Sequence, residues 1–456
     1  MSTARAEKTP QQDQPLAVEV LEGRDAFNAL EREWNAALAR GPRDEPMLRH
    51  EWMRAWIENF APGATLKTFV ARTGKEIHTA VPLLESRDRD ADTCFVPLTT
   101  WALPVNDHSL RGGILLGARA KEALPLVFES IVAAPGWDRL RLRDMPHGAA
   151  EWTVRDLAER DGFRCGIWTS LSSPYRVLPE LPKPMLVANG GKKQKGREAP
   201  QGRYDLVEAS LDSKFRQNLR RRKRRLAEQG ETRYVLVTGA GGAGEKDAKA
   251  LDVALADFFA IEASGWKGRG GTAIAQRPEL VGFYTQIARD AAKRGALALG
   301  FLEHKGVRIA AHLSVVHGGK HYLVKLGYDE SFHEYSPGQQ LTSEAIRDSC
   351  ERGLCEFDFL GPDMAWKRDW EPALRTHSWL TIFRPTGKGK LVHEARFVIW
   401  PVARAAARAV AAGVRSLRAE ERASPATGVA PEARSIGDER ASPATNVAPQ
   451  APSIGD

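Results

Sequence analysis

The alternation of apolar and polar residues along the chain predicts many short strands interleaved with helices. Where apolar residues recur every three or four positions we expect helices, and where they alternate or run together we expect strands. Strands are predicted at residues 16–22, 66–72, 77–84, 94–100, 112–116, 138–143 and 163–169, and again at 233–237, 297–303, 307–316, 320–326, 354–360 and 379–384. Helices are predicted at 24–40, 50–60, 120–134, 149–161, 214–226, 247–264, 279–294 and 337–352.

The order of these elements in the first half returns after residue 204, although no residue-level repeat is visible. This predicts an α/β protein, with α+β layering and two lobes. The expected parts are a disordered N-terminus (1–14), a first lobe (15–180), a flexible Gly- and Lys-rich linker (181–203), a second lobe (204–385), an amphipathic C-terminal helix (386–420) and a disordered tail (421–456). The tail holds two 18-residue repeats rich in Ala, Pro and Ser, which cannot build a core.

The charged residues matter through their distribution more than through the net charge of +8. Residues 214–225 hold eight cations, and apolar residues near helical spacing predict one helix with a thin apolar seam. Its basic faces suit the phosphates of a cofactor, RNA or anionic lipid, and a solvated surface helix is the alternative. Residues 403–418 form a second amphipathic stretch, for which we expect packing on the protein surface or contact with anionic lipid through Arg404–Arg418.

The spacing of the cysteines and the length of the apolar runs indicate the cellular compartment of the protein. The four cysteines are scattered, without a C-x-x-C pair, so we expect a reducing compartment and no structural zinc site. The N-terminus has no secretory pattern, and no run of eighteen apolar residues exists. These features predict a cytoplasmic protein, peripheral to the inner face of the membrane if a basic helix binds lipid.

One stretch gathers several signals for chemistry. Ser336 can cap a helix that Pro337 begins, and Gln339 stands where it would close a capping box. A loop that enters a helix presents unpaired N–H groups, which suit phosphate. Glu356 and Asp358 share one face of the next strand. The combination predicts a nucleotide-cofactor cradle beside an acid–base site, and an ordinary core helix is the alternative.

The two carboxylates have competing interpretations. Asp358 can act as a general base with Glu356 beside it, or both can form structural ion pairs with Lys325 or Lys367. Lys367 follows the end of their strand and is the better functional candidate in its segment, where we expect Trp366 to pack in the core.

A flexible loop supplies further candidates. Residues 265–271 follow a helix and combine glycines with cations and an aromatic ring. They form either a plain helix stop or a substrate-facing lid. In the lid, Trp266 would be a platform and Lys267 would carry the charge.

Taken together, several motifs resemble those of the CelD/BcsL-like branch of the GNAT acyltransferases, a group tied by name to bacterial cellulose and exopolysaccharide production. The resemblance covers roughly residues 15–385. The motifs are the Arg-rich 214–226 helix, 49–53, 81–83, Ser264-Gly265-Trp266-Lys267-Gly268, 309–311, Lys325-Leu326-Gly327-Tyr328-Asp329, Tyr335-Ser336-Pro337-Gly338, Glu356-Phe357-Asp358-Phe359 and Trp366-Lys367.

The resemblance implies two GNAT-like lobes, each a mixed, mostly antiparallel sheet flanked by helices, with the acyl donor on the second. It implies three sets of site residues. The donor-binding residues would be Lys325, Ser336, Pro337, Gly338, Gln339 and Gln340. The substrate-binding residues would be Trp266, Lys267, Tyr328 and Asp329, and the catalytic residues Asp358, Glu356 and Lys367. The loop departs from the usual Q/R-x-x-G-x-G/A pattern, because it offers a single glycine, Gly338.

The implied activity is transfer of an acyl group from acetyl-CoA or another acyl-CoA to an amine or hydroxyl of a cellulose, exopolysaccharide or cell-envelope precursor, without a metal. Two alternatives stay open. The related FemABX transferases use aminoacyl-tRNA, which the basic helix would also suit. A non-catalytic, membrane-associated module would instead contact anionic lipid through Arg220–Arg225 or Arg404–Arg418.

Overall fold

The computed structural model describes residues 15–181, 202–239, 245–265 and 269–411, apart from 405 and 407. Backbone contacts divide the chain into a unit of residues 1–400 and a second unit of residues 401–456. The first unit contains the sheet and both halves predicted from the sequence. The described residues of the second unit are helical.

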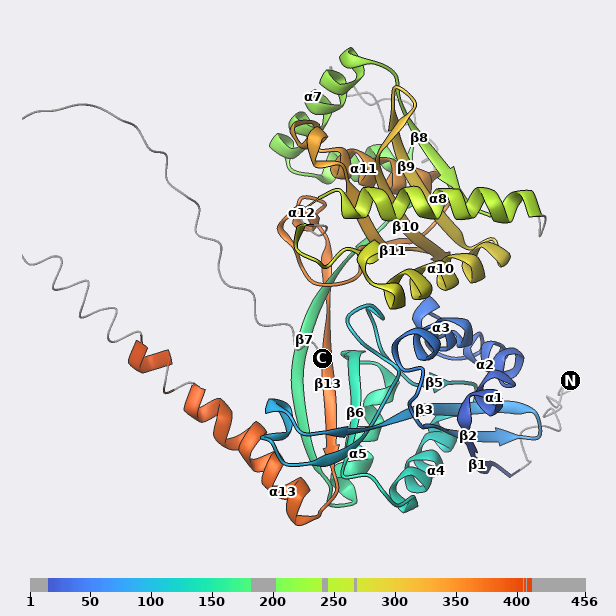
Figure 1. Ribbon diagram of the computed structural model, residues 1–456, viewed down its shortest axis with the longest axis vertical. Helices are drawn as coiled ribbons and strands as arrows, with labels where there is room; N and C mark the ends of the chain where they lie inside the picture. The colour runs from blue at the N-terminus through green and yellow to red at the C-terminus, as the bar shows by residue number, and fades with distance from the viewer. Residues whose placement is uncertain are drawn as a thin grey trace, which may run out of the picture. The chain divides into compact units, whose positions relative to one another are not determined.

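The described strands form a single mixed sheet that runs through both halves of the first unit (Figure 1). From one edge the order is β1 (Ala17–Glu22), β2 (Leu66–Thr73), β3 (Glu76–Asp88), β4 (Leu98–Ala102), β6 (Arg139–Pro146), β13 (Ala373–Phe383), β7 (Arg164–Val177), β12 (Glu356–Asp358), β11 (Lys320–Tyr328), β10 (Val307–His317), β9 (Leu297–His304) and β8 (Thr232–Val237). The short β5 (Leu115–Leu116) pairs with β3.

Each half repeats one arrangement of strands. Three antiparallel strands, β2–β4 in the first half and β9–β11 in the second, precede a helix and a strand that pairs in parallel with the last of the three. These parallel pairs are β4 with β6 and β11 with β12. Parallel neighbours need a crossover connection, which α4 (Ala120–Ala133) and α11 (Pro337–Glu351) provide. The predicted fold class, a mixed α/β protein, is confirmed.

The two halves are joined by long strands. β13 comes from the C-terminal half of the chain, yet it lies between β6 and β7 of the first half. β7 in turn pairs with β13 along its length and with β12 near its end. The predicted strand 163–169 is therefore longer than expected, because it spans both halves.

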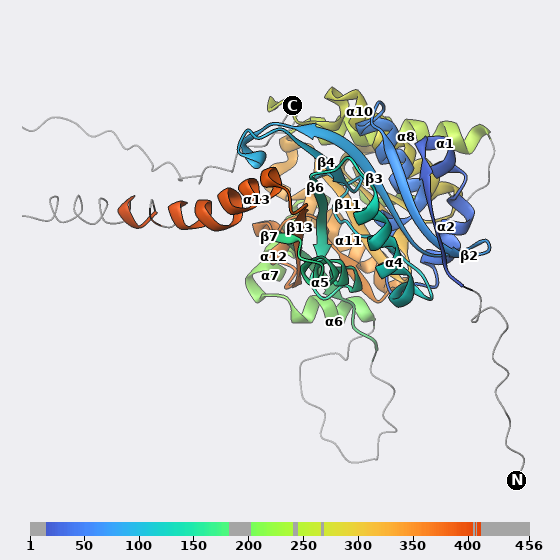
Figure 2. The same cartoon turned by 90° about the horizontal axis from the view of Figure 1, so that it is seen from below.

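Helices cover the sheet in both halves (Figure 2). The first half carries α1 (Gly23–Asn28), α2 (Glu31–Leu38), α3 (His50–Phe60), α4 and α5 (Thr153–Arg160). The second carries α6 (Arg203–Ser210), α7 (Ser213–Gln229), α8 (Glu245–Ala263), α10 (Pro278–Lys293), α11 and α12 (Ala365–Arg368), and α13 (Gly387–His393) follows β13. α3 packs on α10 in one continuous apolar core, where the rings of Trp52 and Phe283 lie 5.7 Å apart.

Two local predictions are wrong. The helix expected at 24–40 is divided, because a tight turn in which the Leu30 N–H bonds to the Phe27 carbonyl separates α1 from α2. The strand expected from residue 94 begins only at Leu98. Cys94 and Phe95 have φ of 51° and 60°, which is left-handed rather than extended backbone.

Candidate functional site

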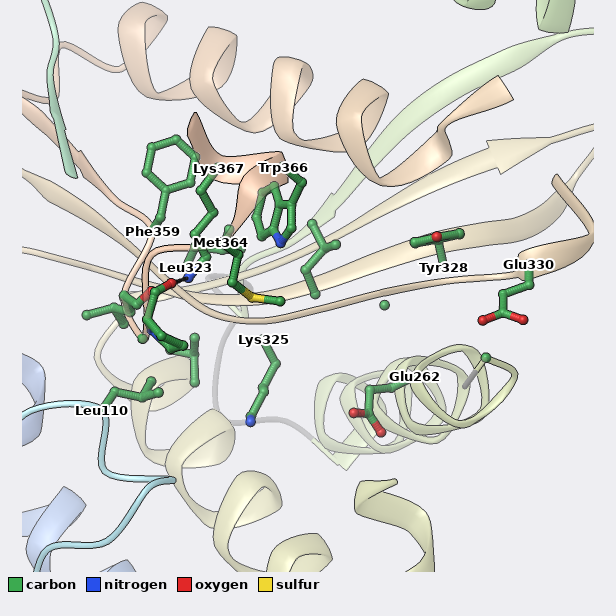
Figure 3. Close-up of a pocket in the computed structure, with 17 residues that line it drawn as sticks. Leu110, Glu262, Leu323, Lys325, Tyr328, Glu330, Phe359, Met364, Trp366 and Lys367 are labelled. Atoms are coloured by element: carbon green, nitrogen blue, oxygen red, sulfur yellow. Dashed lines mark hydrogen bonds between the residues drawn. The ribbon is translucent and has the colours of Figure 1, made fainter. Parts of the chain in front are cut away.

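A cavity of about 420 Å³ opens where β11 and β12 stop pairing (Figure 3). The two strands are hydrogen-bonded only from Lys320 to Tyr322 and from Glu356 to Asp358. Beyond these residues the strands diverge. The cavity is lined by the rest of β11 and by residues 359–362, which follow β12.

The loop after β12 is fixed by two side chains that bind the backbone N–H and the backbone carbonyl of Leu360. The Leu360 N–H donates to Asp358 Oδ1 at 2.9 Å, and Lys367 Nζ donates to the Leu360 carbonyl at 2.5 Å. Lys367 Nζ also donates to the Pro362 carbonyl at 2.9 Å. Leu360 and Gly361 have φ of 50° and 59°, so the chain makes a left-handed turn that leads it away from β11.

Lys367 combines burial with a place in the cavity wall. Its side chain is 5% exposed, and burial lowers its pKa from the ordinary 10.5 to about 8, although the carboxylates of Asp358 and Asp363 oppose the change. An ammonium group has three donors, of which the two loop carbonyls take two. The remaining N–H can donate to negative charge that develops on a bound group.

A second cavity, of about 530 Å³, lies between α7 and the start of α11. Lys214, Asn218 and Arg222 line it from α7, and Ser336, Gly338 and Gln339 line it from the entrance to α11. Leu326, Tyr328 and Trp366 line both cavities, which therefore adjoin. The carboxylates of Asp212 and Asp369 also line the second cavity, and the first has the diverging strands as its walls.

The entrance to α11 differs from the predicted capping box. The helix begins at Pro337 as expected, but the Ser336 side chain makes no capping hydrogen bond and accepts one from Arg222 instead. The backbone of Ser336 is left-handed, with a φ of 50°, whereas a capping serine is usually extended. The Gln339 side chain is occupied elsewhere, because it donates to the Trp366 carbonyl and accepts from the Trp370 indole at 2.7 Å.

Four of the eight basic residues of α7 form ion pairs with carboxylates. The pairs are Arg220 with Glu208, Lys223 with Glu344, Arg224 with Glu228 and Arg225 with Glu334. Lys214 and Arg222 are the cations of α7 that line the second cavity. The positive charge available to a ligand there is therefore more local than the sequence indicated.

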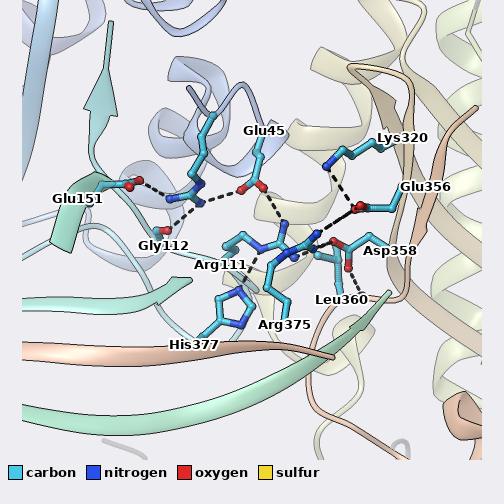
Figure 4. A network of polar contacts seen from close by, with 11 residues as sticks. Glu45, Arg111, Gly112, Glu151, Lys320, Glu356, Asp358, Leu360, Arg375 and His377 are labelled. Atoms are coloured by element: carbon cyan, nitrogen blue, oxygen red, sulfur yellow. Dashed lines mark hydrogen bonds and ion pairs between the residues drawn. The ribbon is translucent and has the colours of Figure 1, made fainter. Parts of the chain in front are cut away.

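Asp358 and Glu356 lie in a buried ion-pair network and line neither cavity (Figure 4). Asp358 Oδ2 accepts from Arg111 at 2.7 Å and from Arg375 at 2.9 Å, and its other oxygen accepts the Leu360 N–H. Glu356 pairs with Lys320 and Arg375. Because the carboxylates are held by these partners and line neither cavity, the placement favours the structural ion pair over the general base. The partners are Arg111, Arg375 and Lys320 in place of the expected Lys325 and Lys367.

The remaining predicted residues divide into three groups. Lys325 and Tyr328 line the first cavity, with Lys325 Nζ 5.5 Å from the centre of the Tyr284 ring. Asp329 caps the turn that follows β11, and Gln340 of α11 donates back to the Tyr335 carbonyl at the end of that turn. Trp266 and Lys267 lie outside the described residues.

Several residues at these sites escaped the sequence-based prediction. Trp366 packs against the core as expected, but it also forms part of the wall of both cavities, whereas Trp370 is fully buried. Arg111, which is 247 positions away in the chain, and Arg375, which is 17 positions away on β13, bind Asp358, and no local pattern marks them. Glu262 of α8 also lines the first cavity. Only its position directly after the apolar run Phe258–Ile261 could have indicated it.

Within the described part of the chain, no group of three or more His, Cys, Asp or Glu side chains is placed to hold a metal ion. The helices of that same part are all too short or too polar to cross a membrane.

The sequence profile of the acetyltransferase (GNAT) domain matches residues 213–368, which contain both cavities' strands and helices α7 to α12. The chain thus contains a GNAT-type acetyltransferase domain. None of the curated proteins matches the chain in sequence.

Among solved structures, the chain is similar to the crystal structure of FemX, with a TM-score of 0.49, 12% identity and coverage of 79% of this chain and 96% of FemX. It is also similar to L-PGS from Bacillus licheniformis, with a TM-score of 0.44, 10% identity and coverage of 80% and 96%. A tandem GNAT protein from the clavulanic acid biosynthesis pathway gives a TM-score of 0.40 and 12% identity, with coverage of 81% and 100%.

Proposed function

We propose that the protein is an acyl-CoA-dependent N- or O-acyltransferase whose donor occupies both cavities. The observation that carries the proposal is that a cavity at the start of a helix, where Lys214 and Arg222 line it, adjoins a cavity between diverging strands. The pyrophosphate of coenzyme A would lie beside Lys214, Arg222 and Gly338, where a helix N-terminus adds favourable charge. The thioester arm would pass Tyr328 and Trp366 and place the carbonyl between β11 and β12.

The proposed reaction is direct transfer. The nitrogen or oxygen of the acceptor attacks the thioester carbonyl and forms the new bond to carbon, after which the carbon–sulfur bond breaks. The acceptor releases one proton, and the departing thiolate takes up one. Lys367 is proposed to stabilise the negative charge on the carbonyl oxygen through its third N–H. Holding both reactants in the cavity supplies further acceleration.

We propose that the acceptor is an amine- or hydroxyl-bearing sugar of a cellulose, exopolysaccharide or envelope precursor. It would enter the first cavity beside Glu262 and Lys325, which line the wall formed by α8 and β11.

Contact with anionic lipid is part of this proposal. Leu391, Ile399 and Trp400 are exposed apolar side chains close to the cations of residues 388–396.

The donor is tested by thermal unfolding of the purified protein during titration with acetyl-CoA. A ligand that binds only the folded state raises the melting temperature by mass action. We expect stabilisation of the wild type, an affinity about tenfold lower in Arg222→Gln, and an unchanged affinity in Arg224→Gln. The last variant is a matched control, because Arg224 lies on the same helix, is paired with Glu228 and does not line the cavity.

Other outcomes would support other functions. Salt-sensitive binding of aminoacyl-tRNA that is lost on neutralising Arg220–Arg225, without an acetyl-CoA effect, would identify a tRNA-dependent transferase. Binding to anionic liposomes without stabilisation by either donor would identify a membrane-associated module. A panel of acyl-CoAs read by native mass spectrometry would define the acyl chain.

A further inference from the structure

A network of buried charges connects the first half of the chain to the wall of the first cavity (Figure 4). In the first half, Arg43 pairs with Glu151 and Glu45, and Glu45 Oε1 accepts from Arg111 at 2.9 Å. Arg111 then donates to Asp358 of β12. The side chains of Arg111 and Asp358 are 1% and 0% exposed.

Asp358 links this network to Leu360, which lines the first cavity. One of its oxygens receives Arg111 and Arg375, and the other receives the N–H of Leu360, whose left-handed turn separates β12 from β11. Without the guanidinium groups, the carboxylate would be an uncompensated buried charge and would lose its fixed position. The turn that opens the cavity therefore depends on side chains from outside the GNAT domain.

The segment that carries Arg111 also reaches the cavity by itself. Leu110 precedes Arg111 in the loop between β4 and β5, and it lines the same cavity. Leu110 has a φ of 66°, so the loop makes a left-handed turn beside Arg111. His377 accepts from Arg111 Nε at 3.2 Å, and burial and the charge of Arg111 lower the pKa of His377 to about 3, which keeps this imidazole neutral.

We infer that Arg111 is a positioning residue: from the first half of the chain, it fixes the Asp358–Leu360 turn and thereby the width of the donor cavity in the second half. The first half then contributes to donor binding through this contact. The inference rests on the proposed function for its effect on the donor, but its effect on the turn can be measured without any donor.

The test compares Arg111→Met with Arg139→Met. Arg139 is a matched control, because it is also buried in the first half, donates to Asp88 at 2.6 Å and lies outside both cavities. Hydrogen exchange of peptides covering residues 359–366 is measured by mass spectrometry in the full-length protein. We expect exchange at the Leu360 amide to become at least tenfold faster in Arg111→Met and to stay at the wild-type rate in Arg139→Met.

Donor binding provides the second measurement. We expect the dissociation constant for acetyl-CoA to rise at least tenfold in Arg111→Met and to remain within twofold in Arg139→Met. Arg111→Lys keeps the charge but cannot bridge two carboxylates in a fork, so it should restore exchange protection only in part. It also serves as the test variant if Arg111→Met does not fold.

Equal exchange at residues 359–366 in the Arg111 and Arg139 variants would overturn the inference. Failure of the wild type to bind acetyl-CoA would count against the proposed donor alone, because the exchange measurement does not depend on it. Faster exchange with an unchanged dissociation constant would overturn the link between the turn and the donor.

Discussion

Lys367→Met tests the buried ammonium at the centre of the cavity wall through the pH dependence of folding stability. The side chain is 5% exposed, and its pKa falls from 10.5 when unfolded to about 8 in the folded protein because of burial. Between these pH values the unfolded state binds more protons than the folded state. The free energy of unfolding therefore rises with pH in this window. The penalty is fully present below about pH 8 and disappears by about pH 10.5.

The magnitude follows from the two pKa values. Between pH 7 and pH 9.5 the contribution of Lys367 to the free energy of unfolding should become more favourable by about 2 kcal/mol. Methionine keeps most of the length of the side chain but cannot titrate. The wild type should therefore gain about 2 kcal/mol relative to Lys367→Met over this range, because other groups that titrate cancel in the difference.

The assay is urea unfolding of both proteins at pH 7.0 and at pH 9.5. Loss of two hydrogen bonds to the Leu360 and Pro362 carbonyls lowers the stability of the variant, while removal of a buried charge offsets part of that loss. The variant should therefore remain folded at pH 7. Stability differences that are the same at both pH values would refute the assignment of a buried, titrating ammonium to this position.

Three further predictions concern turnover, donor affinity and stability. Acyl transfer should decline as the pH rises through about 8, because deprotonation removes the charge of Lys367. The Lys367→Arg variant should retain activity above pH 9. A flat pH profile of the wild type would contradict the role of Lys367 in charge stabilisation. Gly338→Val should raise the dissociation constant for acetyl-CoA about tenfold, because even a Cβ would lie 3.2 Å from the Tyr328 ring and 3.3 Å from Leu326. Isothermal titration of wild type and variant measures the change. Equal affinities would remove Gly338 from the donor site. Asp358→Asn should lower the free energy of unfolding by about 3–5 kcal/mol, because Arg111 and Arg375 lose their shared anionic partner, and a loss below 1 kcal/mol by urea unfolding would show that the network is not structural.

The sequence was informative wherever a local pattern decides the structure. Apolar spacing located α3 and α11 closely, and the repeated order of elements predicted two halves of similar construction. The contact between Asp358 and Arg111 could not be predicted in this way, because the two residues are 247 positions apart and meet only when the sheet is complete. For the same reason the sequence indicated a structural ion pair for the carboxylates of Asp358 and Glu356, but it did not identify their partners.

The capping box failed for a different reason. The Ser-Pro-Gly-Gln pattern fits a capped helix, but the left-handed backbone at Ser336 and the indole of Trp370 redirect the two polar side chains. Tertiary contacts therefore decided which hydrogen bonds formed. The helix itself still begins at the predicted residue, since Pro337 sets the backbone for the first turn.

The ion pairs of α7 help to distinguish the proposed donor, acetyl-CoA, from the alternative donor, aminoacyl-tRNA. A nucleic acid is bound through many phosphates, so its affinity falls steeply with salt, whereas coenzyme A presents a few phosphates to a small site. Four cations of α7 are engaged by carboxylates, and two line the second cavity. We therefore expect the affinity for acetyl-CoA to fall with salt as if about two charges are neutralised. The same salt dependence can be measured with aminoacyl-tRNA. A slope of log affinity against log salt that indicates six or more neutralised phosphates would show instead that the paired arginines leave their carboxylates and bind the nucleic-acid backbone.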